Sequence, residues 1–208
     1  MGSRLIPLLL ARGHKVRALA RKGSENKLPS GCEIISGNPL EKESFAHQIH
    51  PSDTFVQLVG VPHPSPAKAE QFRAIDLVSI RASVAAAEAA KIQHFVYVSV
   101  AQPAPMMKDY IAVRAEGESL LGSSGLNSTI LRPWYVLGPG HRWPCVLLPA
   151  YWFFELLPPT RDGARRLGLV TLNQMLFALV HAVENPAAGI RIVEVPEIHN
   201  LSRHSRRG

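Results

Sequence analysis

Cysteine is scarce in this chain, and several other signatures are missing. Only Cys32 and Cys145 occur in 208 residues, so neither a disulfide framework nor a Cys-x-x-Cys zinc or redox motif is indicated. The opening residues lack the apolar core and cleavage site of a secretory signal. The nine histidines are scattered, and His47 with His50 lack a third ligand. These absences predict a cytoplasmic protein without a metal site.

A long uninterrupted apolar run is also missing. The most apolar stretch, 143–159, reads WPCVLLPAYWFFELLPP, but Pro144 and Pro149 break it and Glu155 interrupts it. A membrane-spanning helix needs about 20 consecutive apolar residues. We therefore expect no membrane span, and we interpret this stretch as a buried segment or as a lid over a pocket.

Acidic residues are outnumbered, 16 against 23 lysines and arginines, which gives a formal net charge of +7. The basic residues crowd the first 22 positions and the tail. Such a distribution favours phosphate-bearing partners, either a dinucleotide or a nucleic acid. No nucleic-acid recognition motif accompanies the charge, so nucleic acid is the disfavoured partner. The tail, 198–208, is predicted to be basic and disordered.

Apolar patterns along the chain alternate between the strand and the helix period. A helix is expected from Ser3 until Gly13 stops it. Further helices are expected at 70–91, 110–122 and 172–184, and strands at 15–21, 32–38, 54–61, 94–101, 128–138, 165–171 and 189–197. Because strands and helices alternate, the pattern predicts one α/β domain with a parallel sheet covered by helices on both faces.

Four segments carry a resemblance to a known family. They read GSRLIPLLLARGHKVRALAR, GNPLEKESF, HFVYVSVA together with YIAVRAEGESLL, and STILRPWYVLGPG. The chain resembles the atypical and extended short-chain dehydrogenase/reductase superfamily, with its NAD(P)-binding, NmrA-like and epimerase/dehydratase relatives. The resemblance implies a Rossmann-like, doubly wound parallel sheet over 1–197, with a small substrate-side portion at about 139–197.

The beginning of the sequence departs from that family's pattern. The family starts with a short strand and a G-x-x-G-x-x-G turn, and Gly2 falls on the third glycine. The first strand lies at the centre of the sheet in the strand order 3-2-1-4-5-6. We therefore expect two half-sheets with exposed inner edges. We expect either that the sequence starts within a longer reading frame or that the chain is a shortened, weakly binding relative.

Several residues resemble the family's cofactor contacts. Arg21 and Lys22 stand at the position that selects between NAD and NADP. In the family an acidic residue there binds the ribose of NAD, whereas a basic residue accepts the 2′-phosphate of NADP, so NADP is favoured. The alternative is an ordinary basic turn. Asn38 replaces an acid that contacts adenine, although it can equally be a turn residue. Gly60 would let the chain pass close to the cofactor.

The family's Tyr-x-x-x-Lys pair is altered. Tyr110 has Arg114 at the lysine position, and the i, i+4 spacing puts both on one helix face. Arginine keeps the positive charge that favours an ionised phenol, but its planar fork fits differently. The family's assisting serine position falls at Val100, with Ser99 one residue away. Tyr110 is therefore either the acid/base or a half-buried aromatic residue at the start of a helix.

The segment LRPWYVLGPG resembles the part of the family that lies along the nicotinamide. The resemblance places Pro133 and Tyr135 at that pocket, capped by the apolar stretch from Trp143. It implies a small or hydrophobic carbonyl or alcohol substrate, and an NADPH-dependent oxidoreductase or epimerase. The alternative is a non-catalytic, NADP-sensing regulatory protein of the NmrA type, or a relative with impaired cofactor binding.

Overall fold

The computed structural model describes residues 1–104, 106–138 and 167–204. Its parallel strands form a four-stranded sheet and two two-stranded sheets. The described strands are β1 Arg17–Ala20, β2 Glu33–Ser36, β3 Thr54–Gln57, β4 His94–Val98, β5 Asn127–Arg132, β6 Tyr135–Leu137, β7 Leu169–Thr171 and β8 Ile190–Glu194. The described α-helices are α1 Gly2–Leu10, α2 Ala69–Gln71, α3 Val78–Ala89, α4 Lys108–Ser124, α7 Leu172–Glu184 and α8 Val195–His204.

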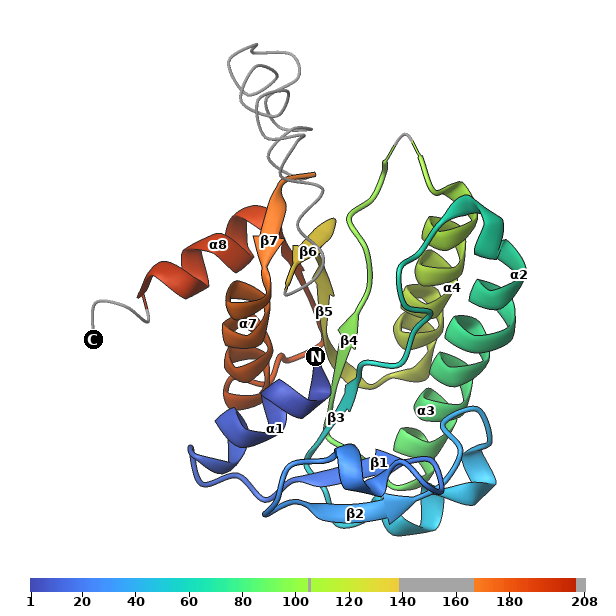
Figure 1. Cartoon of the computed structure of the whole chain (residues 1–208), viewed down its shortest axis with the longest axis vertical. Coiled ribbons are helices and arrows are strands. Elements are labelled where there is room, and N and C mark those ends of the chain that lie inside the picture. The colour runs from blue at the N-terminus through green and yellow to red at the C-terminus, as the bar shows by residue number, and fades with distance from the viewer. Residues whose placement is uncertain (105, 139–166, 205–208) are drawn as a thin grey trace.

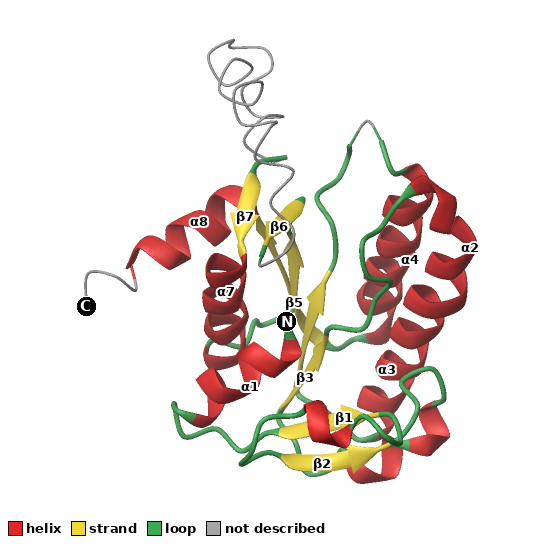
Figure 2. Cartoon of the chain, viewed as in Figure 1, coloured by secondary structure: helices red, strands yellow, loops and turns green. Residues whose placement is uncertain are grey.

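The main sheet has the order β3-β4-β5-β8, and helices cover both of its faces (Figure 1). Helices α3 and α4 lie on one side, and α1 and α7 lie on the other (Figure 2). Phe95 and Tyr97 of β4 point into the core on the α3–α4 side, whereas Val96 points into the core on the α1–α7 side. The predicted α/β fold is confirmed, and so is a strand buried on both faces, but this strand spans His94–Val98 and not 94–101.

Helix α7 begins and ends where its sequence predicts. Thr171 accepts a hydrogen bond from the backbone N–H of Gln174, and the Gln174 side chain returns to the Thr171 backbone. This capping box satisfies N–H groups that the first turn of a helix leaves unpaired. Helix α4 ends in a different way, because Gly125 follows it with φ +74°, a left-handed conformation that glycine adopts without strain.

The sequence prediction was wrong about the end of the chain. Strand β8 ends at Glu194, and Val195–His204 form helix α8 instead of a strand to 197 and a disordered tail. Val195 and Ile198 are fully buried, three residues apart, so helical spacing places both on one apolar face. Residues 205–208 lie outside the described part, as do 139–166 with the proposed lid and Cys145.

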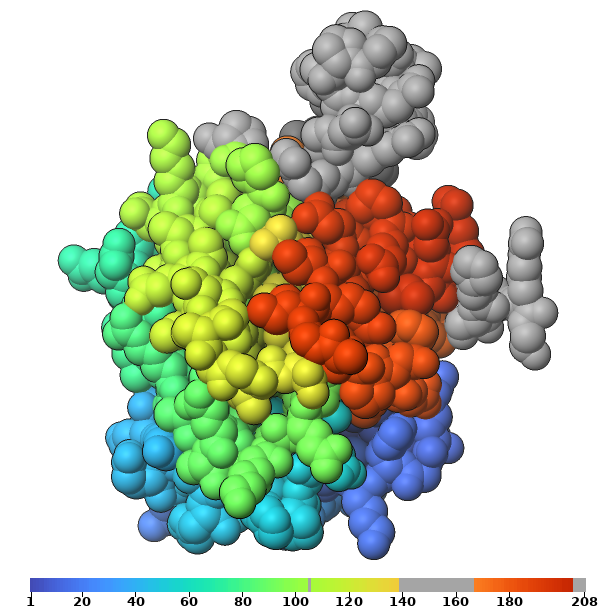
Figure 3. All heavy atoms as spheres, turned by 180° about the vertical axis from the view of Figure 1, so that it is seen from behind, coloured from blue at the N-terminus to red at the C-terminus, as the bar shows by residue number. Residues whose placement is uncertain are grey.

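The expected division into two half-sheets is observed. Strands β1 and β2 pair only with each other among the described residues, and no described strand lies between β1 and β3. Seen from behind, the amino-terminal segments (blue to cyan) form one end of the molecule, below β5, α4 and the carboxyl-terminal elements (Figure 3).

Candidate functional site

The residues selected from the sequence follow the carboxyl ends of successive strands. Within the four-stranded sheet these are Gly60 after β3, Ser99 after β4 and Pro133 after β5. Because these strands are parallel, their carboxyl ends meet at one edge, where open α/β sheets bind ligands. The candidate site is therefore this edge, together with the start of α1 and the turns after β1 and β2.

Helix α1 begins at Gly2 without a side-chain cap. Its Arg4 and Leu5 amides donate to the Met1 carbonyl, at 3.0 and 3.1 Å. A Cβ at Gly2 would meet Leu58 Cδ1 at 3.8 Å, an ordinary contact. No side chain caps the first turn of α1, and the amide groups at the start of a helix favour an anion. This end of α1 therefore fits a phosphate group.

Arg21 and Lys22 are exposed in the turn that follows β1. The Arg21 carbonyl accepts from the Ser24 amide at 2.9 Å, and Gly23 between them has φ +82°. Neither basic side chain makes a hydrogen bond or ion pair within the described ranges. Both charges are therefore available to a ligand phosphate.

Asn38 is engaged in a local turn. Its Oδ1 accepts from the Leu40 amide at 3.1 Å, and its Nδ2 donates to Glu41 Oε1 at 2.7 Å. The Asn38 amide also donates to Ser44 Oγ at 2.8 Å. This is the turn role that asparagine commonly takes. Contact with an adenine edge would require Asn38 Nδ2 to leave Glu41.

Tyr110 and Arg114 are brought together with three residues from other elements, and we call this set the Arg114 cluster: Gly60, Asp76, Tyr97, Tyr110 and Arg114. The guanidinium carbon of Arg114 lies 5.1 Å from the centre of the Tyr110 ring and 5.7 Å from that of Tyr97. Such distances allow cation–π attraction.

Asp76 holds the guanidinium of Arg114 in place. Arg114 Nη2 donates to Asp76 Oδ1 at 2.5 Å, and Arg114 Nη1 donates to the Val98 carbonyl at 2.9 Å. The other Asp76 oxygen accepts from the Val61 amide at 2.9 Å. Side-chain exposure is 7% for Arg114 and 0% for Asp76. The pair therefore ties the loop after β3 to the end of β4.

Gly60 is needed at its position because of Arg114. A Cβ at residue 60 would overlap Arg114 Nη2 and lie 3.2 Å from Asp76 Oδ1. The sequence indicated a glycine that lets a cofactor approach, whereas the described structure fills that space with a guanidinium. Asp76 itself was missed. Its sequence signal is a lone acid between Ile75 and Leu77 in an apolar helical run.

Burial dominates the ionisation of this cluster. It raises the pKa of Tyr97 to about 12 and also raises the pKa of Tyr110, with the Arg114 charge opposing in both cases. Burial acts against the Arg114 cation, but the neighbouring tyrosines and Asp76 more than compensate and keep its pKa above the ordinary value. Arg114 is therefore a permanent positive charge beside both phenols.

Ser99 belongs to a second charged network. Its hydroxyl donates to Glu118 Oε1 at 2.5 Å, and Arg132 Nη2 donates to Glu118 Oε2 at the same distance. Arg132 also reaches Glu194 at 3.3 Å. Tyr110, Arg114 and Glu118 are spaced four residues apart on α4, so Ser99 meets the same helix face one turn beyond Arg114.

The segment after β5 presents aromatic side chains. The Pro133 carbonyl accepts from the Ala101 amide at 2.9 Å, which joins this segment to the one after β4. The Trp134 and Tyr135 rings meet edge-on, with centroids 5.4 Å apart. Pro133 and Tyr135 therefore lie at the expected edge of the sheet.

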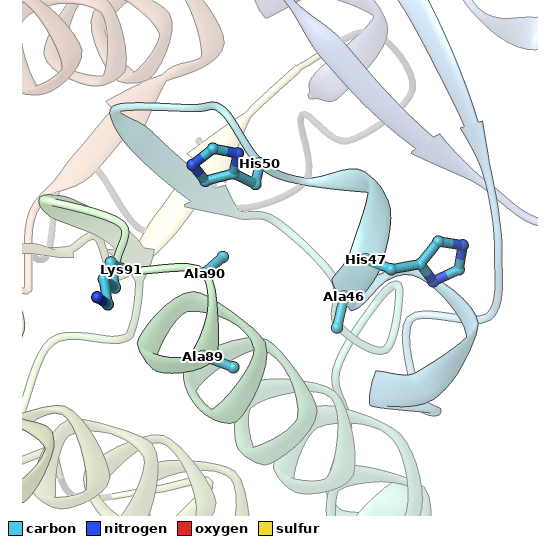
Figure 4. Close-up of a pocket in the computed structure, with 6 residues that line it drawn as sticks. All are labelled: Ala46, His47, His50, Ala89, Ala90 and Lys91. Carbon is cyan, nitrogen blue, oxygen red and sulfur yellow. The ribbon is translucent and has the colours of Figure 1, made fainter.

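A hollow among the described residues lies away from this edge. It has a volume of about 550 Å³ and is lined by Ala46, His47, His50, Ala89, Ala90 and Lys91. These residues precede β3 and β4, at the edge opposite the carboxyl ends. The His47 and Lys91 side chains point away from each other (Figure 4). The hollow therefore lacks converging polar groups and is separate from the candidate site.

Two further kinds of feature are absent from the described part of the chain. No three His, Cys, Asp or Glu side chains gather where they could hold a metal ion. Likewise, none of the helices in 1–104, 106–138 and 167–204 has both the length and the apolarity that crossing a membrane requires.

Parallel strands with helices on both faces, and loops gathered at the carboxyl edge, define a Rossmann-like dinucleotide-binding protein. A protein-family model described as NAD(P)H-binding matches residues 1–141. The chain belongs to this NAD(P)H-binding family. No curated protein sequence matches the chain.

Solved structures share the fold at low sequence identity. WbmH of Bordetella bronchiseptica, in complex with NAD+, has a TM-score of 0.67 at 21% identity and covers 93% of this chain and 71% of its own. The dTDP-glucose 4,6-dehydratase DesIV of Streptomyces venezuelae, a double mutant with NAD and DAU bound, has 0.66 at 18%, covering 97% and 76%. UDP-glucose 4-epimerase of Thermus thermophilus, with NAD, has 0.65 at 16%, covering 99% and 80%. These likenesses confirm the expected Rossmann-like fold, and the family model confirms the expected NAD(P)-binding membership.

Proposed function

We propose that the chain binds NADP(H) in the cytoplasm and reduces or epimerises a small or hydrophobic carbonyl or alcohol. The observation that carries the cofactor choice is the pair of exposed cations after β1, Arg21 and Lys22, which have no partner in the described ranges. A 2′-phosphate at this turn would receive charge-assisted hydrogen bonds. The three solved structures named above carry NAD, so the preference for NADP rests on this turn.

The uncapped start of α1 at Gly2 would hold the diphosphate, and Arg21 with Lys22 the adenosine phosphate. Asn38 would contact the adenine, Pro133 and Tyr135 would line the nicotinamide side, and Ser99 would stand beside them. Gly60 would keep the loop after β3 close to this site. NADPH, when bound, supplies the hydride. The contribution of the chain is to bind, orient and move a proton.

Tyr110 is the proposed acid/base. Its phenol would donate a proton to the substrate oxygen during reduction, and Arg114, 5.1 Å from its ring, would favour the phenolate that remains. Burial raises the pKa of Tyr110, so the neutral phenol is the resting form at neutral pH. Arg114 thus replaces the family's lysine as the fixed positive charge.

A second candidate function is an NADP-sensing regulatory protein of the NmrA type, without turnover. One observation favours it, because Arg114 is committed to Asp76 and to the Val98 carbonyl, whereas an active pair needs a cation free to touch the ribose. Both functions require the same cofactor site. They differ in whether Tyr110 transfers a proton.

Tryptophan-fluorescence titration with NADPH and NADH tests the cofactor. NADPH should bind more tightly by about tenfold or more, since hydrogen bonds to charged groups contribute roughly 1.5–3 kcal/mol. The double variant Arg21→Glu/Lys22→Glu should lose this preference, and Lys91→Glu, at the opposite edge of the sheet, should keep it. Failure of the wild type to bind either nucleotide would contradict the proposal.

Tyr110→Phe tests the chemistry. The variant should bind NADPH normally and lose carbonyl reduction by about a hundredfold or more, the usual contribution of a general acid. Tyr97→Phe removes the neighbouring buried phenol and serves as the matched control. A wild type that binds NADPH but turns over no carbonyl in a panel would favour the sensor.

A further inference from the structure

Asp76 lies in an unusual stretch of helix. Residues Phe72–Leu77 form a π-helix, labelled η5, between α2 and α3. π-helical turns are rare and often occur at functional sites. The extra residue that such a turn accommodates changes which side chains face inward. Here Phe72, Asp76 and Leu77 are the buried residues of the turn.

The Asp76 carboxylate joins three separate segments. One oxygen accepts from the Val61 amide in the loop after β3, and the other accepts from Arg114 on α4. Arg114 in turn donates to the Val98 carbonyl at the end of β4. An unpaired charge at this depth would cost several kcal/mol, so each partner fixes the other.

Tyr110 is packed into the same assembly. Its ring contacts Phe72 of the π-helix, with centroids 5.0 Å apart and planes tilted by 56°, and the Arg114 guanidinium carbon lies 5.1 Å from the ring centre. The charged or titratable groups that face Tyr110 are Arg114 on its own helix, Asp76 on η5 and Tyr97 on β4. The field at the phenol therefore depends on how Asp76 neutralises Arg114.

We propose that Asp76 is a positioning residue. It fixes the Arg114 guanidinium beside Gly60, where a Cβ would otherwise lie, and against the Tyr110 ring. Through this contact, the geometry of the loop after β3 determines how strongly Arg114 favours the Tyr110 phenolate. A ligand that moves Gly60 or Val61 would shift the guanidinium and change the acidity of Tyr110. The proposal deepens the role proposed for Tyr110 and rests on it, but its test needs neither cofactor nor substrate.

The test uses protein labelled with 3-fluorotyrosine and follows each phenol by ¹⁹F NMR as the pH is raised. Tyr110→Phe and Tyr97→Phe assign the two resonances. In Asp76→Asn the amide keeps its size, but Arg114 loses its neutralising charge. The Tyr110 midpoint should move to lower pH by about one unit or more, a tenfold change in ionisation constant, because the Arg114 cation 5.1 Å from its ring is then no longer neutralised.

The double variant Asp76→Asn/Arg114→Met separates positioning from packing. With both charges removed, the Tyr110 midpoint should return above that of the single variant. A midpoint that stays low in the double variant would mean loosened packing and would overturn the proposal. A Tyr110 resonance that is unchanged throughout the folded pH range in Asp76→Asn would overturn it as well.

Gly60→Ala tests the coupling to the loop. The added Cβ would overlap Arg114 Nη2, so Arg114 must move and the Tyr110 resonance should shift in position and in midpoint. Gly122→Ala is the matched control, because it lies on α4 itself and its Cβ would meet only Ile190 Cδ1, at 3.8 Å. Equal effects of the two substitutions would refute the coupling. Loss of NADPH binding in the fluorescence titration would contradict the proposed function and leave this result standing.

Discussion

The amino-terminal strands β1 and β2 and the edge strand β3 of the four-stranded sheet each have one partner among the described strands, whereas the central strand β4 has two. Phe95 in β4 is fully buried between two neighbouring strands, whereas Phe55 in β3, stacked on it at 5.2 Å, is only half-buried. Strand β3 has a partner on one side only among the described strands. Two phenylalanine side chains in one stack thus differ in burial, and the more buried one belongs to the strand with a second neighbouring strand.

The two regions also treat charge differently. The helical segments η5 and α4 that cover the four-stranded sheet hold the ion pair Arg114–Asp76 almost without exposure. The β1–β2 pair holds Arg17–Glu33, where the Glu33 side chain is 61% exposed. The first pair links elements distant in sequence, and the second links adjacent strands. Charges in the first region therefore fix geometry, whereas those in the second stay hydrated.

Removing one partner from each ion pair should give the largest contrast. Asp76→Ala leaves the Arg114 cation buried and unpaired, which typically costs about 3–5 kcal/mol of unfolding free energy. Glu33→Ala should cost less than about 1 kcal/mol, because its exposed pair is screened by water. Urea unfolding measures both values. Similar losses would mean that the two regions hold their charges in the same way.

The acid sensitivity of the four-stranded sheet should come from His94. Burial, helped by the Arg191 charge, lowers the pKa of His94 to about 4, and its Nε2 contacts Thr129 Oγ1 at 3.0 Å. The unfolded state takes up the proton near pH 6.5, whereas the folded state resists it until about pH 4. Stability is therefore complete above pH 6.5 and falls by roughly 3 kcal/mol as the pH drops to 4.

Urea unfolding at several pH values checks this expectation. The side chain introduced by His94→Gln cannot titrate. The difference in unfolding free energy between wild type and variant should therefore narrow as the pH falls from 6.5 to 4. A difference that stays constant over this range would show that His94 titrates equally in the folded and the unfolded state.

Parts of this fold could be predicted from the sequence, and parts could not. The run 94–101 and the apolar pattern of 172–184 give local signals for a strand and a helix, and the structure has these elements at His94–Val98 and Leu172–Glu184. The α8 helix was missed because its apolar spacing, Val195 to Ile198, is short and follows directly on a strand.

The site was harder to predict than the fold. Tyr110 and Arg114 are one helical turn apart, so their proximity follows from sequence spacing. The partner of Arg114 is Asp76, 38 residues away, and a π-helical turn brings it inward. Neither the turn nor the pairing has a local sequence signal, so the reason for Gly60 could be found only in three dimensions.

The stacked pair Phe95 and Phe55 offers a smaller contrast with the same chemistry. Phe95→Ala should cost about 3–5 kcal/mol of unfolding free energy, the usual loss for a fully buried aromatic ring. Phe55→Ala should cost roughly half as much, because its ring already contacts water. Each substitution also removes the stacking contact between the two rings, so the loss of that contact is common to both variants. Equal values would indicate that β3 is covered as fully as β4.

Amide hydrogen exchange should reveal the smallest difference. The Val16 and Ala20 carbonyls accept hydrogen bonds from the backbone amides of Glu33 and Gly37. Backbone groups alternate in direction along a parallel strand, so those of Leu19 point away from β2. Among the described strands, β1 thus has a hydrogen-bonded partner on one side only, whereas β4 is paired on both sides. The β1 amides that do bond to β2 should exchange roughly tenfold faster than those of β4, because a unit with fewer buried contacts opens at lower free energy. Equal protection would show that both sheets open in one cooperative step, and the unpaired edge of β1 would then carry no cost in local stability.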